Sequence, residues 1–237
     1  MKLLAVDTST EACSAALYID GDVKQQYELA PREHSRLILG MVDALLREAD
    51  ITAKHLDALA FGRGPGSFMG VRIAAGIVQG IAFAHSIPVV PVSTLAAISS
   101  AAIEQTGVNN VLAVIDARMQ EVYWGVYSNR SASGEPTSDE TPYLTLLGEE
   151  RVSAPEQVVI PDSDQWVAAG TGWAAYPDVF KSKVDHGFIS SLDNCLPSAE
   201  AIARLAVEDY KKGVSVSAAQ AVPVYLRDNV ARKTKDR

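Results

Sequence analysis

A glycine-rich segment at residues 62–66 is the strongest candidate for chemistry in this sequence. It reads Gly62-Arg63-Gly64-Pro65-Gly66 and lies between a short apolar run and a long apolar, helix-compatible segment. A strand, a glycine loop and a helix N-terminus together can bind a phosphate through free backbone N–H groups. No Lys-Ser/Thr pair follows the glycines, and the spacing differs from the dinucleotide fingerprint. A phosphate site at Gly64 and Gly66 and a tight turn before a packed helix therefore both stay open.

Carboxylates at the ends of two apolar runs are the second candidate. Asp7 and Thr8 end the first run, and Asp116 ends a similar run in the second half of the chain. In phosphate-transferring enzymes a carboxylate and hydroxyls at this place hold a metal–phosphate group. Two such carboxylates suit a nucleotide with Mg²⁺, although side chains that merely shape two turns of a duplicated fold would give the same pattern. The triplet at 170–172, Gly-Thr-Gly, is more typical of a turn than of a ligand site.

Other catalytic chemistry finds little support. No two of the four histidines lie at i and i+4, and neither of the two cysteines has a Cys or His neighbour in a metal-binding spacing. We therefore expect no metal site. The sequence contains no G-x-S-x-G segment, so a hydrolase nucleophile elbow is not indicated.

The charge and hydropathy of the chain favour a cytoplasmic protein. A formal net charge of −8 repels nucleic acid, so direct RNA binding by this chain alone is not expected. The basic residues at 227–237 are interpreted as a solvated terminus. Asp7 interrupts the N-terminal apolar run too early for a signal peptide. Residues 68–84 contain Arg72 and Gln79, and we interpret them as too short for a membrane span.

The elements that must position these residues form an α/β pattern that restarts halfway. Strands are expected at 3–9, 13–20, 23–29, 56–61 and 88–92, with the first three antiparallel, and helices at 35–50, 67–85 and 94–105. The residues Ala5-Val6-Asp7 are echoed by Val114-Ile115-Asp116, and 13–20 by 121–128. A strand is also expected at 166–172, a helix at 198–212 and a surface loop at 129–142. This repetition predicts two lobes of similar topology, 1–106 and 107–237, with the last helix and tail packing back on the first lobe.

The helix predicted at 67–85 has an unusual composition. Gly70, Gly76 and Gly80 lie within it, and each costs about 1 kcal/mol relative to alanine in a helix interior. Something must therefore approach this helix closely, and both the protein's own sheet and a partner helix satisfy that requirement. Beside the amphipathic helix 35–50, such a helix would make a docking surface.

Six segments of the chain resemble the TsaB (YeaZ) family, over the whole length and in order. They are AVDTSTEACSAALY, HSRLILGMVDALL, GRGPGSFMGVRIAAGIVQGIA, PVVPVSTLAAI, IDARMQEVYWGVY and PVYLRDNVA. The resemblance implies the two-lobed fold of actin-like ATPases, also described as ribonuclease H-like. It also implies a part in attaching threonylcarbamoyl to the tRNA adenosine beside the anticodon. In that family the chain pairs with a TsaD-like catalytic subunit, a TsaE-like ATPase binds the pair, and a homodimer forms when the partner is absent.

The resemblance further implies that this chain is not the catalyst. TsaD, the catalytic relative, keeps paired metal-binding histidines where this sequence has Thr94 and Ile98, and neither residue can replace imidazole. We therefore expect a non-catalytic partner with no cofactor of its own, with ATP or ADP and Mg²⁺ belonging to the complex and tRNA contacted only indirectly. The alternative is an autonomous ATP-dependent kinase or hydrolase of the same fold. The expected docking residues are Leu37, Met41, Leu45, Met69, Ile73, Gly76 and Gly80.

Overall fold

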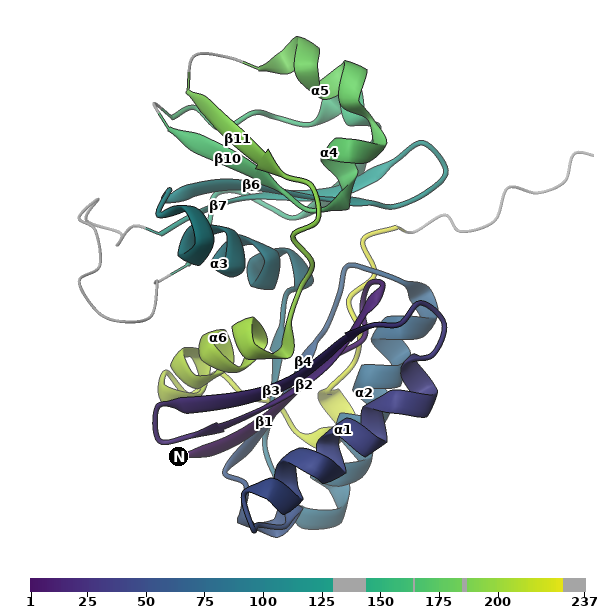
Figure 1. Cartoon of the computed structure of the whole chain (residues 1–237), viewed down its shortest axis with the longest axis vertical. Coiled ribbons are helices and arrows are strands. Elements are labelled where there is room, and N and C mark those ends of the chain that lie inside the picture. The colour runs from purple at the N-terminus through teal and green to yellow at the C-terminus, as the bar shows by residue number, and fades with distance from the viewer. Residues whose placement is uncertain (130–143, 164, 185–186, 228–237) are drawn as a thin grey trace, which may run out of the picture.

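The computed structural model describes residues 1–129, 144–163, 165–184 and 187–227. The chain forms two lobes, each built around one mixed β-sheet (Figure 1). The predicted surface loop at 129–142, apart from its first residue, and the basic tail beyond residue 227 lie outside the described residues.

The first sheet has the strand order β3-β2-β1-β4-β5. Strands β1, β2 and β3 are antiparallel neighbours, whereas β4 and β5 run parallel to β1. The antiparallel start predicted from the sequence is thus confirmed. The five strands are β1 (Lys2–Asp7), β2 (Ala12–Ile19), β3 (Asp22–Leu29), β4 (Ala58–Gly62) and β5 (Val89–Val92).

The second sheet repeats this topology. Its order is β11-β10-β6-β7-β8, with β9 also paired to β7, and β6 takes the central place that β1 has in the first sheet. Strand β7 is antiparallel to β6. Strand β10 is parallel to β6, and β11 is parallel to β10. The predicted duplication is therefore confirmed. The strands are β6 (Asn110–Asp116), β7 (Val122–Ser128), β8 (Thr145–Leu146), β9 (Arg151–Ser153), β10 (Trp166–Ala169) and β11 (Phe188–Leu192).

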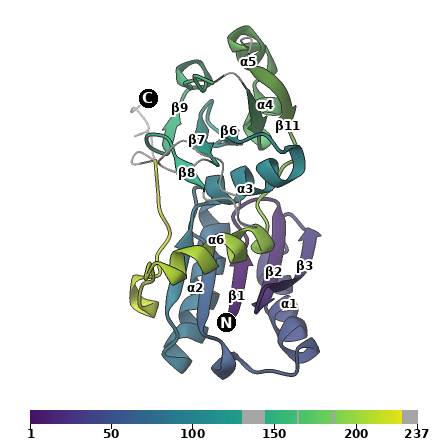
Figure 2. The same ribbon diagram turned by 90° about the vertical axis from the view of Figure 1, so that its left-hand side faces the viewer.

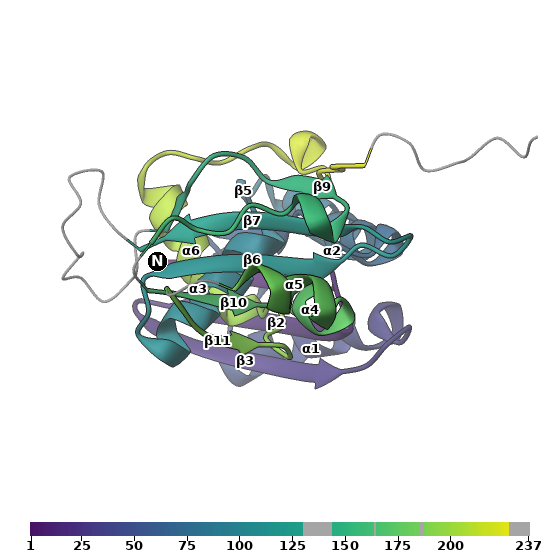
Figure 3. The ribbon, with the colours of Figure 1, turned by 90° about the horizontal axis from the view of Figure 1, so that it is seen from above.

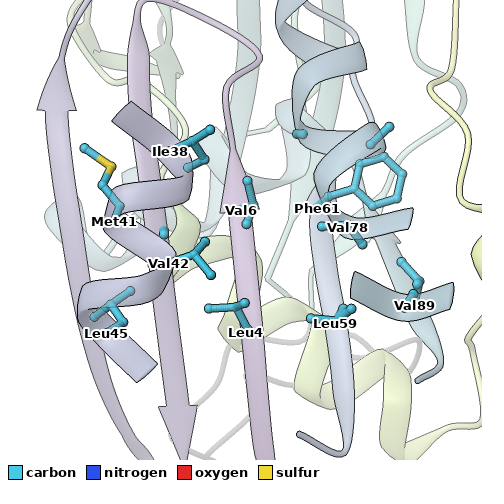
Figure 4. Close-up of a cluster of buried hydrophobic side chains, with 14 of the residues drawn as sticks. Leu4, Val6, Ile38, Met41, Val42, Leu45, Leu59, Phe61, Val78 and Val89 are labelled. Atoms are coloured by element: carbon cyan, nitrogen blue, oxygen red, sulfur yellow. The ribbon is translucent and has the colours of Figure 1, made fainter. Parts of the chain in front are cut away.

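Helices cover both faces of the first sheet. Successive side chains of a strand point to opposite faces, and β1 accordingly sends Leu4 and Val6 to one side and Leu3 and Ala5 to the other. Helices α1 (His34–Glu48) and α2 (Phe68–His85) pack side by side on the Leu4 face, as Figures 1 and 4 show. Helix α6 (Ala199–Lys211), from the end of the chain, covers the opposite face.

The second sheet is also covered on both faces. Helix α3 (Thr94–Thr106) packs on one face, and α4 (Thr171–Ala175) and α5 (Pro177–Lys183) pack on the other around Trp166, Trp173 and Phe180. The helix that ends the first repeat thus lies on the second sheet, and the helix that ends the second repeat lies on the first. Helices α3 and α6 contact each other where the lobes meet (Figure 2). Short 3-10 turns complete the fold at Ala53–His55 (η1), Pro155–Gln157 (η2) and Ala218–Gln220 (η3).

The segment from Val216 to Arg227, which includes η3, ties the two lobes together. Val216 pairs with Val89 of β5, and the Val224 N–H donates to the Arg63 carbonyl at 2.8 Å. Three residues later the Arg227 guanidinium donates to the Ala117 carbonyl at 3.1 Å in the second lobe. We call residues 221–227 the C-terminal strap. Seen from above, the sheet of the second lobe lies in front of the sheet of the first lobe, and the strap runs along one side of them (Figure 3).

Candidate functional site

Asp7 ends β1 in a fully buried position. Its Oδ2 accepts hydrogen bonds from the Ser9 N–H at 3.3 Å and the Ser9 hydroxyl at 3.1 Å, whereas its Oδ1 has no partner. Burial raises the pKa of Asp7 to about 7, against the Ser9 hydrogen bonds, which lower it. Burial thus favours the protonated form of this carboxyl more than in an exposed aspartate.

Glycines close the space around Asp7. A Cβ added to Gly62 would fall well inside van der Waals contact with Asp7 Oδ1, and one added to Gly70 would do the same with the Thr8 carbonyl. A Cβ added to Gly66 would clash with the Ser9 carbonyl. The Ser67 N–H donates to that carbonyl at 2.7 Å. These three glycines are therefore explained by the close approach of the loop to the turn that follows β1.

Gly64 and Thr8 are also engaged within the chain. Gly64 has a φ of +100°, its carbonyl accepts from the Thr94 N–H at 3.0 Å, and a Cβ there would lie 3.0 Å from the Val224 carbonyl. The Thr8 hydroxyl donates to the Gly70 carbonyl at 2.7 Å. The strap and the turn after β1 thus pack directly on the glycine loop.

Asp116 occupies the equivalent turn of the second lobe. Its carboxylate accepts from the Arg118 N–H and guanidinium, both at 2.9 Å, and its own N–H donates to the Thr171 hydroxyl at 3.2 Å. Gly170 and Gly172 approach Val114 of β6 as closely as Gly62 approaches Asp7. The Gly-Thr-Gly triplet is therefore the tightly packed junction between β10 and α4, with Gly170 before the helix and Thr171 and Gly172 in its first turn.

A buried polar cluster joins the glycine loop to the second lobe. The Glu150 carboxylate accepts from the hydroxyls of Ser93 and Tyr127, and it lies 3.7 Å from the Arg63 guanidinium. Burial, followed by the neighbouring Glu150 charge, raises the pKa of Tyr127 well above its usual range. Arg63 therefore points to Glu150 of the second lobe rather than to Asp7.

These contacts do not fit the predicted site for a nucleotide phosphate. Asp7 has no exposed surface, and the Thr8 hydroxyl and the Ser67 N–H are already bonded within the chain. A phosphate would have to displace the packing around Asp7 to reach it. We therefore assign no chemical step to a nucleotide at this place.

Other groups also offer little reactivity. Burial raises the pKa of both Cys13 and Cys195 to about 11, so little thiolate forms near neutral pH. Thr94 and Ile98 are fully buried in α3. Within the described part of the chain, no group of three His, Cys, Asp or Glu side chains could hold a metal ion.

Two of the predicted docking residues lie in the core. Met41 is 7% exposed and Leu45 is 1% exposed, and both pack toward the first sheet with Ile38 and Val42 (Figure 4). We predicted them on an exposed face, and that assignment is wrong. They belong to the i, i+3, i+4 stripe by which α1 attaches to its own sheet. Leu37 and Ile73 are partly buried and pack against the same core.

An exposed face remains on α1 and α2, and we call it the helical face. Leu39 is 57% exposed, Phe68 54%, Met69 63% and Phe83 84%. Gly76 and Gly80 lie between Met69 and Phe83 on α2, and both are exposed. The helical face consists of Leu39, Gly40, Phe68, Met69, Arg72, Gly76, Gly80 and Phe83.

Internal packing does not explain the glycines of this face. Among the described residues, a Cβ added to Gly40 of α1 or to Gly76 or Gly80 of α2 would meet nothing within 4 Å beyond its own helix backbone, in contrast to Gly70 of α2. Each such glycine lowers helix stability by about 1 kcal/mol relative to alanine. Contacts among the described residues therefore give no reason for glycine at these three positions.

Sequence reasoning missed Leu39, Phe68 and Phe83. Leu39 falls outside the apolar stripe of α1, and Phe83 follows Gly76 and Gly80 at i+7 and i+3 on one helix face. Both spacings are visible in the sequence. Leu39, an apolar residue outside the core stripe of α1, and Phe83, which shares a helix face with Gly76 and Gly80, could therefore have been predicted as exposed from the sequence.

The apolar character of α2 also meets a simple criterion for membrane spans. Its 18 residues have a mean hydropathy of 1.3, although only a third of this window is buried. Core helices of soluble proteins meet the same criterion. In this structure, Ala74, Ala75 and Val78 of α2 are buried in the core cluster that covers the first sheet.

Comparison with known proteins gives full-length matches. A family model described as "TsaD: tRNA N6-adenosine threonylcarbamoyltransferase" matches residues 26–235. The chain is 44% identical to the tRNA threonylcarbamoyladenosine biosynthesis protein TsaB of Escherichia coli, over 98% of this chain and 97% of that protein. The Haemophilus influenzae protein of the same name is 41% identical, over 98% and 96%. The solved structure of YeaZ from Pseudomonas aeruginosa matches with a TM-score of 0.84 and 45% identity, over 95% of this chain and 99% of that one.

Proposed function

Because the chain belongs to the TsaB family of tRNA threonylcarbamoyladenosine biosynthesis proteins, we propose that it is the non-catalytic partner subunit of that pathway. It binds and organises a TsaD-like catalytic subunit, which transfers threonylcarbamoyl to tRNA. A TsaE-like ATPase binds the assembled pair. The complex is cytoplasmic, and this chain contacts tRNA only indirectly.

One observation carries the proposal. The glycines of the helical face are open to solvent and flanked by exposed Phe68, Met69 and Phe83, so they suit the close approach of another helix. Exposed aromatic and methionine side chains are the residue types enriched at protein interfaces. The same face pairs two copies of the chain when the catalytic subunit is absent.

Complex formation tests this proposal directly. The purified chain is mixed with the TsaD-like protein of the same organism, and the molar mass is measured by size-exclusion chromatography with light scattering. A heterodimer is expected. Two separate species at micromolar concentrations would contradict the docking role.

We further propose that the isolated chain binds no Mg²⁺–ATP at Asp7, since that carboxyl is buried behind Gly62. Isothermal titration calorimetry of the isolated chain with ATP and Mg²⁺ should show no saturable heat at micromolar ligand. Tight binding that Asp7→Ala removes would instead favour the autonomous ATP-dependent enzyme. Any ATP or ADP with Mg²⁺ then belongs to the complex.

A further inference from the structure

Arg72 is held in a stack at one end of the helical face. Its guanidinium carbon lies 3.3 Å from the centre of the Phe68 ring and 5.1 Å from that of Tyr225. The two rings are 6.0 Å apart, so the cation lies against both. Such contacts between a guanidinium and aromatic faces are attractive, and they hold the guanidinium against the rings.

The C-terminal strap places Tyr225 in this stack. Before Tyr225, the Ala221 carbonyl accepts from the Gln79 amide at 3.0 Å, and the Val224 N–H bonds to the glycine loop. After Tyr225, the Arg227 Nε donates to Glu121 of the second lobe at 2.9 Å. The backbone on either side of Tyr225 is thus held in place, and the Tyr225 ring lies beside Phe68 and Arg72 of the helical face.

Arg72 has no acidic partner in the part of the chain that the structure describes. Its hydrogen bond to the Phe68 carbonyl, at 3.4 Å, uses one N–H of its five donors. A stacked, exposed guanidinium keeps its remaining N–H groups at the edge of the plane, where a carboxylate binds in bidentate geometry. The Arg72 guanidinium is therefore held in place and can bind a carboxylate from outside the chain.

A second copy of this chain supplies that acid poorly. Helix α2 contains no Asp or Glu, and α1 contains only Asp43 and Glu48. Both are already paired, Asp43 with Arg47 at 2.8 Å and Glu48 with Lys24 at 2.7 Å. The acidic residues of these two helices are thus engaged within their own chain, and a different polypeptide is the better source of a carboxylate for Arg72.

We propose that Arg72, held by Phe68 and Tyr225, binds a carboxylate of the TsaD-like subunit and so distinguishes that subunit from a second copy of this chain. The inference rests on the docking role proposed above and names the chemistry of the partner: an acidic side chain beside an apolar helical surface. Arg72 then contributes more to heterodimer than to homodimer affinity.

The test compares two affinities for the same variants. Binding to the TsaD-like protein is measured by calorimetry, and self-association by analytical ultracentrifugation. Arg72→Glu should weaken the heterodimer at least about thirtyfold and change self-association less than about threefold. Arg72→Lys, which keeps the charge, and Tyr225→Ala, which removes half of the stack, should each weaken the heterodimer about threefold to tenfold. The exposed Arg151→Glu, in the second lobe, is the charge-matched control and should bind normally.

The outcomes separate this inference from the docking role itself. Normal heterodimer affinity for Arg72→Glu, with binding still lost in Gly76→Leu, overturns the carboxylate contact and leaves the docking role standing. Equal weakening of heterodimer and homodimer overturns the discrimination between partners. Heterodimer formation by both Arg72→Glu and Gly76→Leu at wild-type affinity overturns the docking role as well. Thermal unfolding of each variant shows whether its fold is retained.

Discussion

Gly76→Leu should abolish binding to the TsaD-like subunit while making the isolated chain slightly more stable. The Cβ of a leucine at this exposed position meets nothing beyond its own helix backbone among the described residues, and leucine improves helix propensity by about 1 kcal/mol. In the complex, the same side chain fills the space into which a partner helix packs. We expect the affinity to fall at least about a hundredfold. Overpacking and lost shape complementarity at the centre of an interface both weaken binding. Calorimetry and thermal unfolding measure the two effects.

Two controls make this result specific. Glu104→Leu places the same side chain on an exposed site of α3 and should leave binding unchanged. Gly70→Ala, in the same helix, forces a Cβ against the Thr8 carbonyl and should destabilise the chain by about 1–3 kcal/mol. If Gly76→Leu lowers the unfolding temperature as Gly70→Ala does, Gly76 is an internal packing residue and the helical face is misassigned.

Asp7→Asn should stabilise the protein, and the gain should grow as the pH rises. The pKa of Asp7 lies at about 7 in the folded state against 3.8 as the reference value, so the wild type loses stability as the pH rises through this range. Each pKa unit corresponds to about 1.4 kcal/mol. The difference in unfolding free energy between the variant and the wild type should therefore increase by about 2 kcal/mol between pH 5.5 and pH 8. Denaturant unfolding at both pH values measures it.

Asparagine suits this test because its carbonyl can still accept both hydrogen bonds from Ser9. The exposed Asp22→Asn serves as the control for the loss of one carboxylate and should give no such trend. A variant that is less stable than the wild type at pH 8 would show that the Asp7 charge is useful, and it would reopen the case for a cation or phosphate site there.

The sheets and their duplication could be predicted because they depend on local patterns. Alternating or continuous apolar runs define β1, β2, β6 and β7, and the Asp at the end of β1 and of β6 marks the repeat. Helix α1 was predicted to start at Ser35, whereas it starts one residue earlier, at His34, and the Ser35 side chain does not cap it. Helices α4 and α5 and strand β11 were missed, since they are short and are defined by packing around Trp166 and Trp173.

The candidate site could be predicted only in part. In α2 the sequence shows three similar glycines, yet Gly70 meets the Thr8 carbonyl and Gly76 faces open space. Because α2 is apolar over most of its surface, its helical spacing does not show which side faces its own sheet. For α1, the same apolar periodicity that predicted the helix also identified its buried side, so Met41 and Leu45 were poor choices for docking. Likewise, only the fold brings Tyr225 beside Arg72, over a separation of more than 150 residues in sequence.

Reconstituted tRNA modification tests most directly whether this chain organises the catalytic subunit. The TsaD-like protein, the TsaE-like ATPase, a threonylcarbamoyl donor and tRNA are combined with the wild-type chain, with Gly76→Leu or with no added chain. The threonylcarbamoyladenosine formed is then quantified. We expect modification with the wild-type chain and only background levels in the other two reactions. Full modification without the chain would contradict the proposed role.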